Sequence, residues 1–146
     1  MKHYLIEEQF MHQGYPCVII FTTLGHRCGY VGVPRNHPAY GKNDDEIDVG
    51  VHGGLTYCRD DQDGYPVAGQ DCWWFGFDCA HGGDGQDLKR AREIFQDPAL
   101  DMLIALQAKS TFRESLPVRS QEYVKTECRS LATQLKDMEK APGGGR

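Results

Sequence analysis

The chain has 146 residues, the size of one domain with its own hydrophobic core. Its net charge is −5, but residues 44–87 alone hold eleven acidic residues and one basic residue, a net charge of −10. A general nucleic-acid binder normally carries a basic face, so this charge distribution argues against that class. With 40% hydrophobic and 25% charged residues, the composition is that of a folded globular domain.

Sequence signals for export or membrane insertion are missing. No apolar stretch follows the first residues as in a secretory signal, and no apolar run approaches the roughly 18 residues that a membrane helix requires. We therefore expect a protein of the cytoplasm. No Cys-x-x-Cys pair is present, and we expect most of the six cysteines to be reduced packing residues: Cys17, Cys28, Cys58, Cys72, Cys79 and Cys128.

Glycine divides the chain into two halves. Fourteen of the 17 glycines lie between Gly14 and Gly85, and none lies between residues 86 and 142, which indicates strands and turns followed by helices. Runs of β-branched and aromatic residues predict strands, the second and third of which form a hairpin through a turn at Leu24-Gly25-His26. The predicted strands are Tyr4–Phe10, Cys17–Thr23, Arg27–Val33, Ile47–Tyr57 and Cys72–Ala80.

The second half predicts helices. Asp97 followed by Pro98 is typical of a helix start. The segment Ser120–Lys140 has apolar residues spaced by four and three, a stripe that can cover one face of a sheet: Val124, Cys128, Leu131, Leu135 and Met138. We therefore predict a single α+β domain over residues 1–140, with a mainly antiparallel sheet of four to six strands, a C-terminal amphipathic helix packed on it, and a flexible tail at 141–146.

Candidate chemistry concentrates in two segments, VHGGLTY at residues 51–57 and WWFGFDCAHGGDG at residues 73–85. Asp78 lies within an apolar run, where a carboxylate needs a partner, and His52 is its candidate partner. A metal site of His52, Asp78, His81 and Asp84, with Asp48 as a further candidate, would suit zinc, manganese or iron and could activate water.

Three other interpretations of these residues stay open. Asp78 could orient His52 or His81 for metal-free acid–base catalysis. A ligand could bind without turnover, held by backbone amides at the glycine pairs and by Thr56, Tyr57, Trp73, Trp74 and Asp84. A buried His–Asp pair could also simply join two strands.

Four motifs in succession, RCGYVGVPRNHPAYG, VHGGLTY, WWFGFDCAH-x-GD and EYVKTECRSLATQL, resemble a family of small phage and prophage proteins. The resemblance covers roughly residues 27–135. It implies an accessory or counter-defence protein acting in the cytoplasm of a bacterial host. The partners it implies are a host protein complex or a small nucleotide-like ligand. Separately from the resemblance, a homodimer stays open.

Three functions follow as hypotheses. The first is binding of a small ligand or host partner through the His/Asp/aromatic site. The second is a small metal-dependent hydrolase, with zinc or manganese, that uses the same residues. The third is an acidic inhibitor whose loops over residues 44–71 mimic nucleic-acid phosphates.

Overall fold

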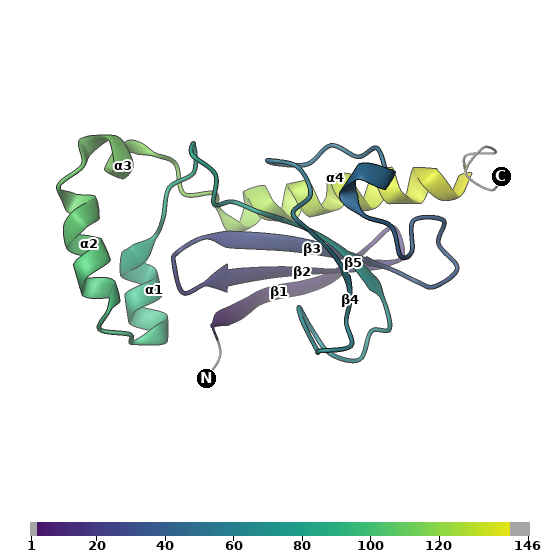
Figure 1. Cartoon of the computed structure of the whole chain (residues 1–146), viewed down its shortest axis with the longest axis horizontal. Coiled ribbons are helices and arrows are strands. Elements are labelled where there is room, and N and C mark those ends of the chain that lie inside the picture. The colour runs from purple at the N-terminus through teal and green to yellow at the C-terminus, as the bar shows by residue number, and fades with distance from the viewer. Residues whose placement is uncertain (1–2, 141–146) are drawn as a thin grey trace.

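The described part of the chain has a five-stranded antiparallel sheet, one long helix on one face of it and three short helices at one end (Figure 1). The computed structural model describes residues 3–140, so the tail predicted at 141–146 lies outside the described residues. The strands run in the order β1-β2-β3-β5-β4. Their bounds are β1 Tyr4–His12, β2 Tyr15–Thr22, β3 Arg27–Val33, β4 Tyr57–Asp60 and β5 Trp73–Asp78.

The α+β prediction is confirmed, including the C-terminal helix. Helix α4 (Gln121–Lys140) packs against β3, β2 and β1. At the left of Figure 1, the short helices α1 (Leu88–Phe95), α2 (Leu100–Ala108) and α3 (Thr111–Ser115) form a separate cluster beside the β2–β3 turn. We call this cluster, residues 88–115, the helical lobe. One 3-10 helix, η1, spans Asp44–Glu46.

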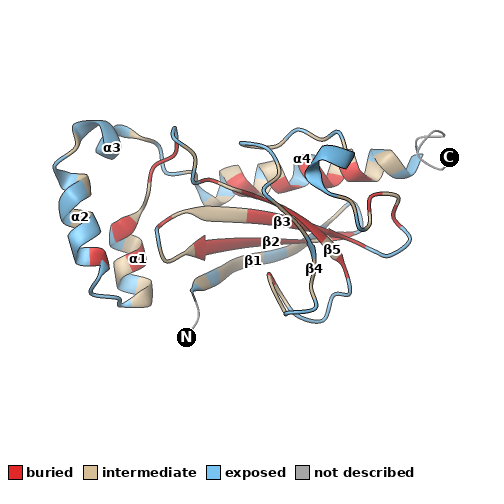
Figure 2. Cartoon of the chain, viewed as in Figure 1, coloured by how far each residue is buried: buried red, intermediate tan, exposed pale blue. Residues whose placement is uncertain are grey.

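The predicted apolar stripe of α4 is the side that covers the sheet. Val124, Cys128, Leu131 and Leu135 are each 0% exposed and pack with sheet residues in the largest core cluster. The helix lies so close that a Cβ on Gly29 of β3 would be 2.6 Å from the Cys128 Sγ. Figure 2 shows this buried layer as the red side of α4 facing the red strands.

The two faces of β5 carry different clusters, as expected for a strand that is apolar on both sides. Phe75 and Phe77 lie under α4, whereas Trp74 lies on the opposite face with Tyr30. All six cysteines are free, and four of them are buried. Burial raises the pKa of the Cys17 and Cys79 thiols to about 12, which agrees with a packing role.

The strand predicted at Ile47–Tyr57 is wrong. Only Tyr57 belongs to a strand, and residues 47–56 run beside α4 as irregular chain. The backbone of Gly50 exchanges hydrogen bonds of 2.7 Å with the Gln134 side chain on α4, so a helix side chain takes the place of a neighbouring strand. The apolar alternation in this segment is still real burial, because Ile47, Val49, Val51 and Leu55 pack against the main core.

The predicted helix start at Asp97-Pro98 precedes α2 by a short turn. Asp97 Oδ1 accepts a hydrogen bond of 3.0 Å from the Ala99 amide, and the Asp97 carbonyl accepts one of 3.1 Å from Leu100, where α2 begins. Asp97 therefore stabilises the turn that leads into the helix. The other short helices were not predicted as separate elements; α1 has its own cap, in which Asp87 accepts from the Arg90 amide at 3.1 Å.

Candidate functional site

A cluster of polar side chains lies where three separate segments meet beside the start of α4. His52 comes from the turn at residues 51–54, and His81 and Asp84 come from the loop after β5. Arg119 and Tyr123 come from the approach to α4 and its first turn. We call these five residues the polar cluster.

Asp84 is the centre of the polar cluster. Its side chain is 2% exposed and accepts hydrogen bonds from Arg119 Nε at 2.8 Å, His52 Nε2 at 2.9 Å and the His81 amide at 3.1 Å. A carboxylate this deeply buried is costly unless it is paired and hydrogen-bonded, and here both oxygens have partners.

The electrostatic consequence is an Asp84 that stays ionised. Burial is the largest single influence and by itself would raise the pKa of the carboxyl. The hydrogen bonds from Arg119, His52 and the His81 amide outweigh it together and lower the pKa of Asp84 to about 2.

The His52 ring is fixed at both nitrogens. Its Nε2 lies 2.9 Å from the ionised Asp84 Oδ2 and therefore carries a proton, which leaves Nδ1 to accept a hydrogen bond from the Tyr123 hydroxyl at 2.8 Å in the neutral ring. The His52 amide donates to Glu127 Oε1 at 2.7 Å. Two residues of α4 thus orient this histidine.

His81 is held differently. Its ring lies over Gly53, where a Cβ would be only 2.2 Å from His81 Cε1. Its Nδ1 is buried and has no hydrogen-bond partner within the described chain, although it lies 3.5 Å from Asp84 Oδ2 and 3.7 Å from Asp78 Oδ1. A buried nitrogen left unbonded in this way is unusual, because buried polar atoms normally have partners.

Arg119 is itself held in place by a buried ion pair. Arg27 donates to the Arg119 carbonyl oxygen at 2.9 Å, and its Nε also lies 2.6 Å from Glu7 Oε1. The Glu7 side chain is 3% exposed and occupies the bulge in β1 between Ile6 and Glu8. The sheet therefore anchors the arginine that pairs with Asp84.

A metal-ligating arrangement is present. One nitrogen each from His52 and His81 and one oxygen of Asp84 all lie within 4.8 Å of one another, so these residues could hold a metal ion. This set matches three of the four residues predicted as ligands. Asp78 and the exposed Asp48 are outside it.

Asp78 has another partner than the one expected. The sequence paired it with His52, but its Oδ2 accepts a hydrogen bond from the Thr56 hydroxyl at 2.9 Å and its Oδ1 accepts from the Ala80 amide at 3.1 Å. The reason is its position: Asp78 is the last residue of β5 and about a third exposed, so it is not enclosed in the apolar run as expected.

The aromatic residues predicted to bind a ligand are not brought to the polar cluster. Trp74 and Tyr57 belong to the core cluster on the sheet face opposite α4. Trp73, at the far end of β5, donates from Nε1 to the Lys42 carbonyl oxygen at 2.9 Å. Of the ligand-binding residues named from the sequence, Asp84 alone is a member of the polar cluster, and Thr56 touches it only through Asp78.

Sequence reasoning missed the contributions of Arg119, Tyr123 and Glu127. A signal was available for two of them, because residues spaced by four along a helix share one face, and Tyr123 and Glu127 follow that spacing beside the apolar stripe. Arg119 precedes the helix, so this spacing does not identify it. His37, in the turn after β3, is 5% exposed; it accepts from the Ala39 amide and donates to the Leu135 carbonyl oxygen at 2.8 Å, so it joins that turn to α4 outside the polar cluster.

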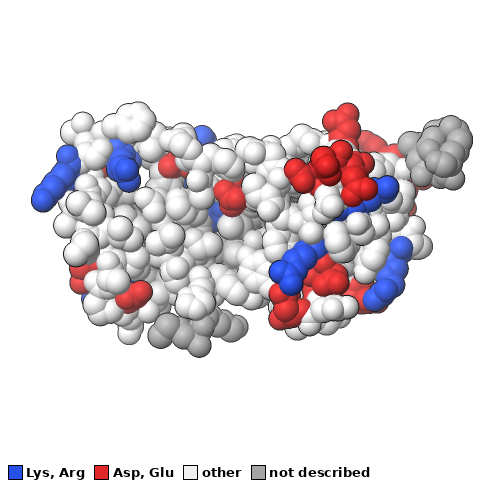
Figure 3. All heavy atoms as spheres, viewed as in Figure 1, with Lys and Arg blue, Asp and Glu red and all other residues white. Residues whose placement is uncertain are grey.

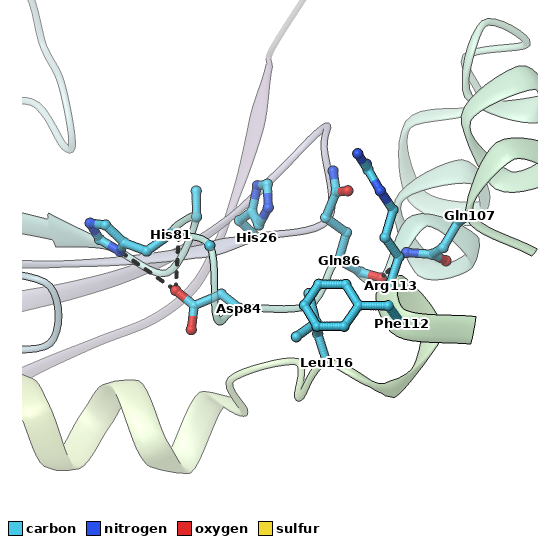
Figure 4. Close-up of a pocket in the computed structure, with 11 residues that line it drawn as sticks. His26, His81, Asp84, Gln86, Gln107, Phe112, Arg113 and Leu116 are labelled. Carbon is cyan, nitrogen blue, oxygen red and sulfur yellow. Dashed lines mark hydrogen bonds and ion pairs between the residues drawn. The ribbon is translucent and has the colours of Figure 1, made fainter. Parts of the chain in front are cut away.

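The polar cluster borders a cavity of about 360 Å³ between the sheet and the helical lobe (Figure 4). His81 and Asp84 line one side of it, and Gln107, Phe112 and Arg113 line the other. Such a volume falls within the range of small-molecule sites, which is about 300–1,000 Å³.

The acidic residues of segment 44–71 lie apart from this cavity. Figure 3 shows acidic side chains gathered in the half of the molecule opposite the helical lobe, where η1 contributes Asp44, Asp45 and Glu46. Several other acids of the segment support their own loops: Asp61 Oδ2 accepts from the Cys72 amide at 3.4 Å, and Asp63 Oδ1 accepts from the Tyr65 amide at 3.2 Å. Much of the negative charge therefore has local structural partners.

Comparison with family models, curated proteins and solved structures found no match to this chain. Within residues 3–140, no helix combines the length and the apolar character needed to cross a membrane.

Proposed function

We propose that His52, His81 and Asp84 bind a divalent transition metal and that the protein is a small metal-dependent hydrolase acting on a polar ligand in the adjoining cavity. The observation that carries this proposal is the unbonded, buried Nδ1 of His81, which faces the same Asp84 oxygen as His52 Nε2. A metal ion would give that nitrogen a partner.

The donor atoms favour particular metals. Two imidazole nitrogens and one carboxylate oxygen suit zinc and also manganese or iron, whereas calcium and magnesium prefer oxygen ligands. Zinc sites with three protein ligands are typical of catalysis, because a fourth position stays open for water or substrate. A bound zinc ion would lower the pKa of that water to about 7 and so supply a nucleophile at neutral pH.

The surroundings of the three ligands support this role. The Tyr123 hydroxyl at His52 Nδ1, and Arg119 at Asp84 Oδ1, hold two of the ligand side chains in fixed orientations. On metal binding through Nε2, the neutral His52 ring would change tautomer: its one proton would move from Nε2 to Nδ1 by exchange with solvent, and Nδ1 would then donate to the Tyr123 oxygen.

The open side of the site faces the cavity. His81 and Asp84 line the cavity directly, and the His81 ring is 37% exposed, so a ligand in the cavity would reach the metal. The hydrolase hypothesis therefore fits this geometry better than the charge-mimic hypothesis, whose acidic loops lie elsewhere. The phage-type, counter-defence setting rests on the sequence motifs alone and stays a prediction.

Metal binding is tested by titrating Zn²⁺ and Mn²⁺ into protein purified without a metal-affinity step. We expect one equivalent to bind, and His52→Ala or His81→Ala to weaken binding at least tenfold, since each variant removes one ligand. His12→Ala is the matched control, because it removes a half-exposed histidine at the end of β1 outside the three-ligand group. The absence of saturable binding to folded wild-type protein would contradict the metal site.

A pair of glycine variants tests the geometry. Gly53 and Gly54 both have positive φ, so alanine strains the backbone at either position by about 1–2 kcal/mol. A Cβ on Gly53 would also enter the His81 ring, whereas one on Gly54 meets no atom within 4 Å. Gly53→Ala should therefore abolish metal binding while Gly54→Ala preserves it.

Turnover is tested with p-nitrophenyl phosphate and p-nitrophenyl acetate on the metal-loaded protein. We expect release of p-nitrophenol that is lost in His81→Ala and unchanged in His12→Ala. Stoichiometric metal binding with no turnover of either compound would reject the hydrolase and leave a metal-binding protein.

A further inference from the structure

The cavity beside the proposed metal site has a lining whose free charges are positive. Asp84 is the one acidic side chain among the described residues that line it, and Arg119 already neutralises that carboxylate. Arg113 lines the opposite wall. A cavity with an unopposed cation attracts an anionic ligand.

Arg113 differs from most arginines of this protein. Arg27, Arg35, Arg59, Arg90, Arg92 and Arg119 each form an ion pair, but within residues 3–140 no carboxylate pairs with Arg113. It also lines the second cavity, of about 350 Å³, which shares Gln86, Gln107 and Leu116 with the first. The charged residues that this second cavity adds are Lys89, Asp87 and Glu114. A free guanidinium between two cavities suits a phosphate group, whose geometry it matches with two parallel hydrogen bonds.

Phe112 supplies a flat apolar surface in the same cavity. Its side chain is 68% exposed, and Figure 4 shows its ring projecting from α3 into the space between the helical lobe and Asp84. An aromatic ring left uncovered beside polar groups is a surface on which a planar base can stack. The carboxamide side chains of Gln86 and Gln107 line the cavity near it.

We infer that this cavity binds a mononucleotide, with Arg113 and the metal attracting the phosphate and Phe112 stacking on the base. This inference rests on the proposed function for the metal, but Arg113 and Phe112 lie outside the metal-ligating group. The ligand is a free nucleotide rather than a nucleic-acid strand, because a cavity of about 360 Å³ encloses a small molecule.

The experiment is calorimetric titration of the zinc-loaded full chain with adenosine 5′-monophosphate, adenosine and inorganic phosphate. We expect the monophosphate to bind at least tenfold more tightly than either of its parts. Guanosine, cytidine and uridine monophosphates are titrated in parallel, because stacking on Phe112 accepts any base.

Two variants separate the phosphate from the base. Arg113→Gln should weaken binding of the monophosphate at least tenfold and leave binding of adenosine unchanged. Phe112→Leu should weaken binding of both the monophosphate and adenosine at least fivefold and leave binding of inorganic phosphate unchanged. Arg129→Gln is the matched control, because Arg129 is also exposed and unpaired within the described chain but lies on α4 outside the cavity lining. We expect Arg129→Gln to bind like the wild type.

Several results would overturn the inference. It fails if none of the four monophosphates binds, or if inorganic phosphate binds as tightly as they do. It also fails if a single-stranded nucleic acid of ten nucleotides binds more tightly than the monophosphate. The metal site survives each of these results provided that Zn²⁺ still binds at one equivalent. If instead Zn²⁺ does not bind but the monophosphate binds in the Arg113- and Phe112-dependent way, the proposed metal function fails and the nucleotide site stands.

Discussion

Helix α4 and the helical lobe use their apolar residues in opposite ways. Four residues of the α4 stripe are 0% exposed against the sheet. In α2 the only buried residue is Leu100, while Met102 is 72% exposed and Leu106 is 56% exposed. The lobe joins the sheet through one small apolar cluster that contains Phe21 of β2 with Leu88, Ala91 and Leu100. Arg90 of α1 adds an ion pair of 2.9 Å to Glu7 of β1.

This difference divides the proposed site into two parts. The metal-ligating residues are fixed by the sheet and by α4, through Tyr123, Glu127 and the Arg27-held loop at Arg119. The residues assigned to the nucleotide, Phe112 and Arg113, stand on the thinly packed lobe. Regions with few buried contacts open at lower free energy than the core, so the geometry of the metal site should be steadier than the shape of the cavity.

The largest expected effect comes from truncating a leucine in each region. Leu131→Ala in α4 should lower the free energy of unfolding by about 2–5 kcal/mol, because the side chain is 0% exposed and its loss leaves a cavity. Leu106→Ala in α2 should change it by less than about 0.5 kcal/mol, because that side chain is already largely in water. Urea unfolding followed by circular dichroism measures both.

The two variants serve as controls for each other, since both exchange a helical leucine for alanine. If Leu106→Ala proved as destabilising as Leu131→Ala, the lobe would be part of the cooperative core and would not differ from α4 in packing.

The sequence was most informative where local pattern and tertiary environment agree. The four-and-three spacing in residues 120–140 identified α4 and its buried face, and the Gly25 turn identified the β2–β3 hairpin, with β3 predicted at its observed bounds. The strand at residues 47–57 failed because alternating burial can be produced by packing along a helix. Whether the backbone pairs with a strand or with Gln134 is a tertiary choice that alternation does not encode.

For the site, chemistry-bearing residues were easier to predict than their pairing. His52, His81 and Asp84 were all named as metal ligands, and the structure brings them together. The predicted partner of His52 was Asp78, and the observed partner is Asp84. The difference depends on the path of the chain after β5: the strand ends at Asp78, and the following loop brings Asp84 back to the buried side. Arg119 comes from a segment 35 residues further along the chain, a distance that no local motif spans.

A second prediction uses pH to test whether Asp84 belongs to the well-packed part of the molecule. Because the pKa of Asp84 is lowered from 3.8 to about 2, the group stabilises the fold above pH 4, and this stabilisation is lost as the pH falls from about 4 toward 2. The shift corresponds to about 2 kcal/mol. Urea unfolding at a series of pH values should show a loss that is about 2 kcal/mol smaller in Asp84→Asn than in the wild type, because Glu8 and Glu139, whose pKa values are also lowered, still contribute in both.

The matched control for this prediction is Asp71→Asn. Asp71 pairs with Arg35 at 3.0 Å, but its side chain is 70% exposed, so solvent screens the pair. The Asp71 variant should keep the full acid-dependent loss seen in the wild type. If it reduced the loss as much as Asp84→Asn, the acid sensitivity would not come from the buried cluster.

The smallest expected effect is at His26, where the sheet meets the lobe. The turn that holds His26 is bonded to the start of the lobe, because the Gly25 carbonyl oxygen accepts a hydrogen bond of 2.9 Å from the Asp87 amide. Burial lowers the pKa of the His26 imidazole, and the charges of Asp78 and Asp84 oppose this shift in part. A lowered histidine pKa means that the unfolded chain binds the proton more readily, so stability is complete above about pH 6.5 and declines below it. His26→Gln should decline less steeply between pH 7 and pH 5 than the wild type, and His3→Gln, which alters an exposed histidine, should follow the wild type. Equal slopes in His26→Gln and the wild type would mean that water reaches this ring freely, and the lobe would then be open at the turn rather than closed over it.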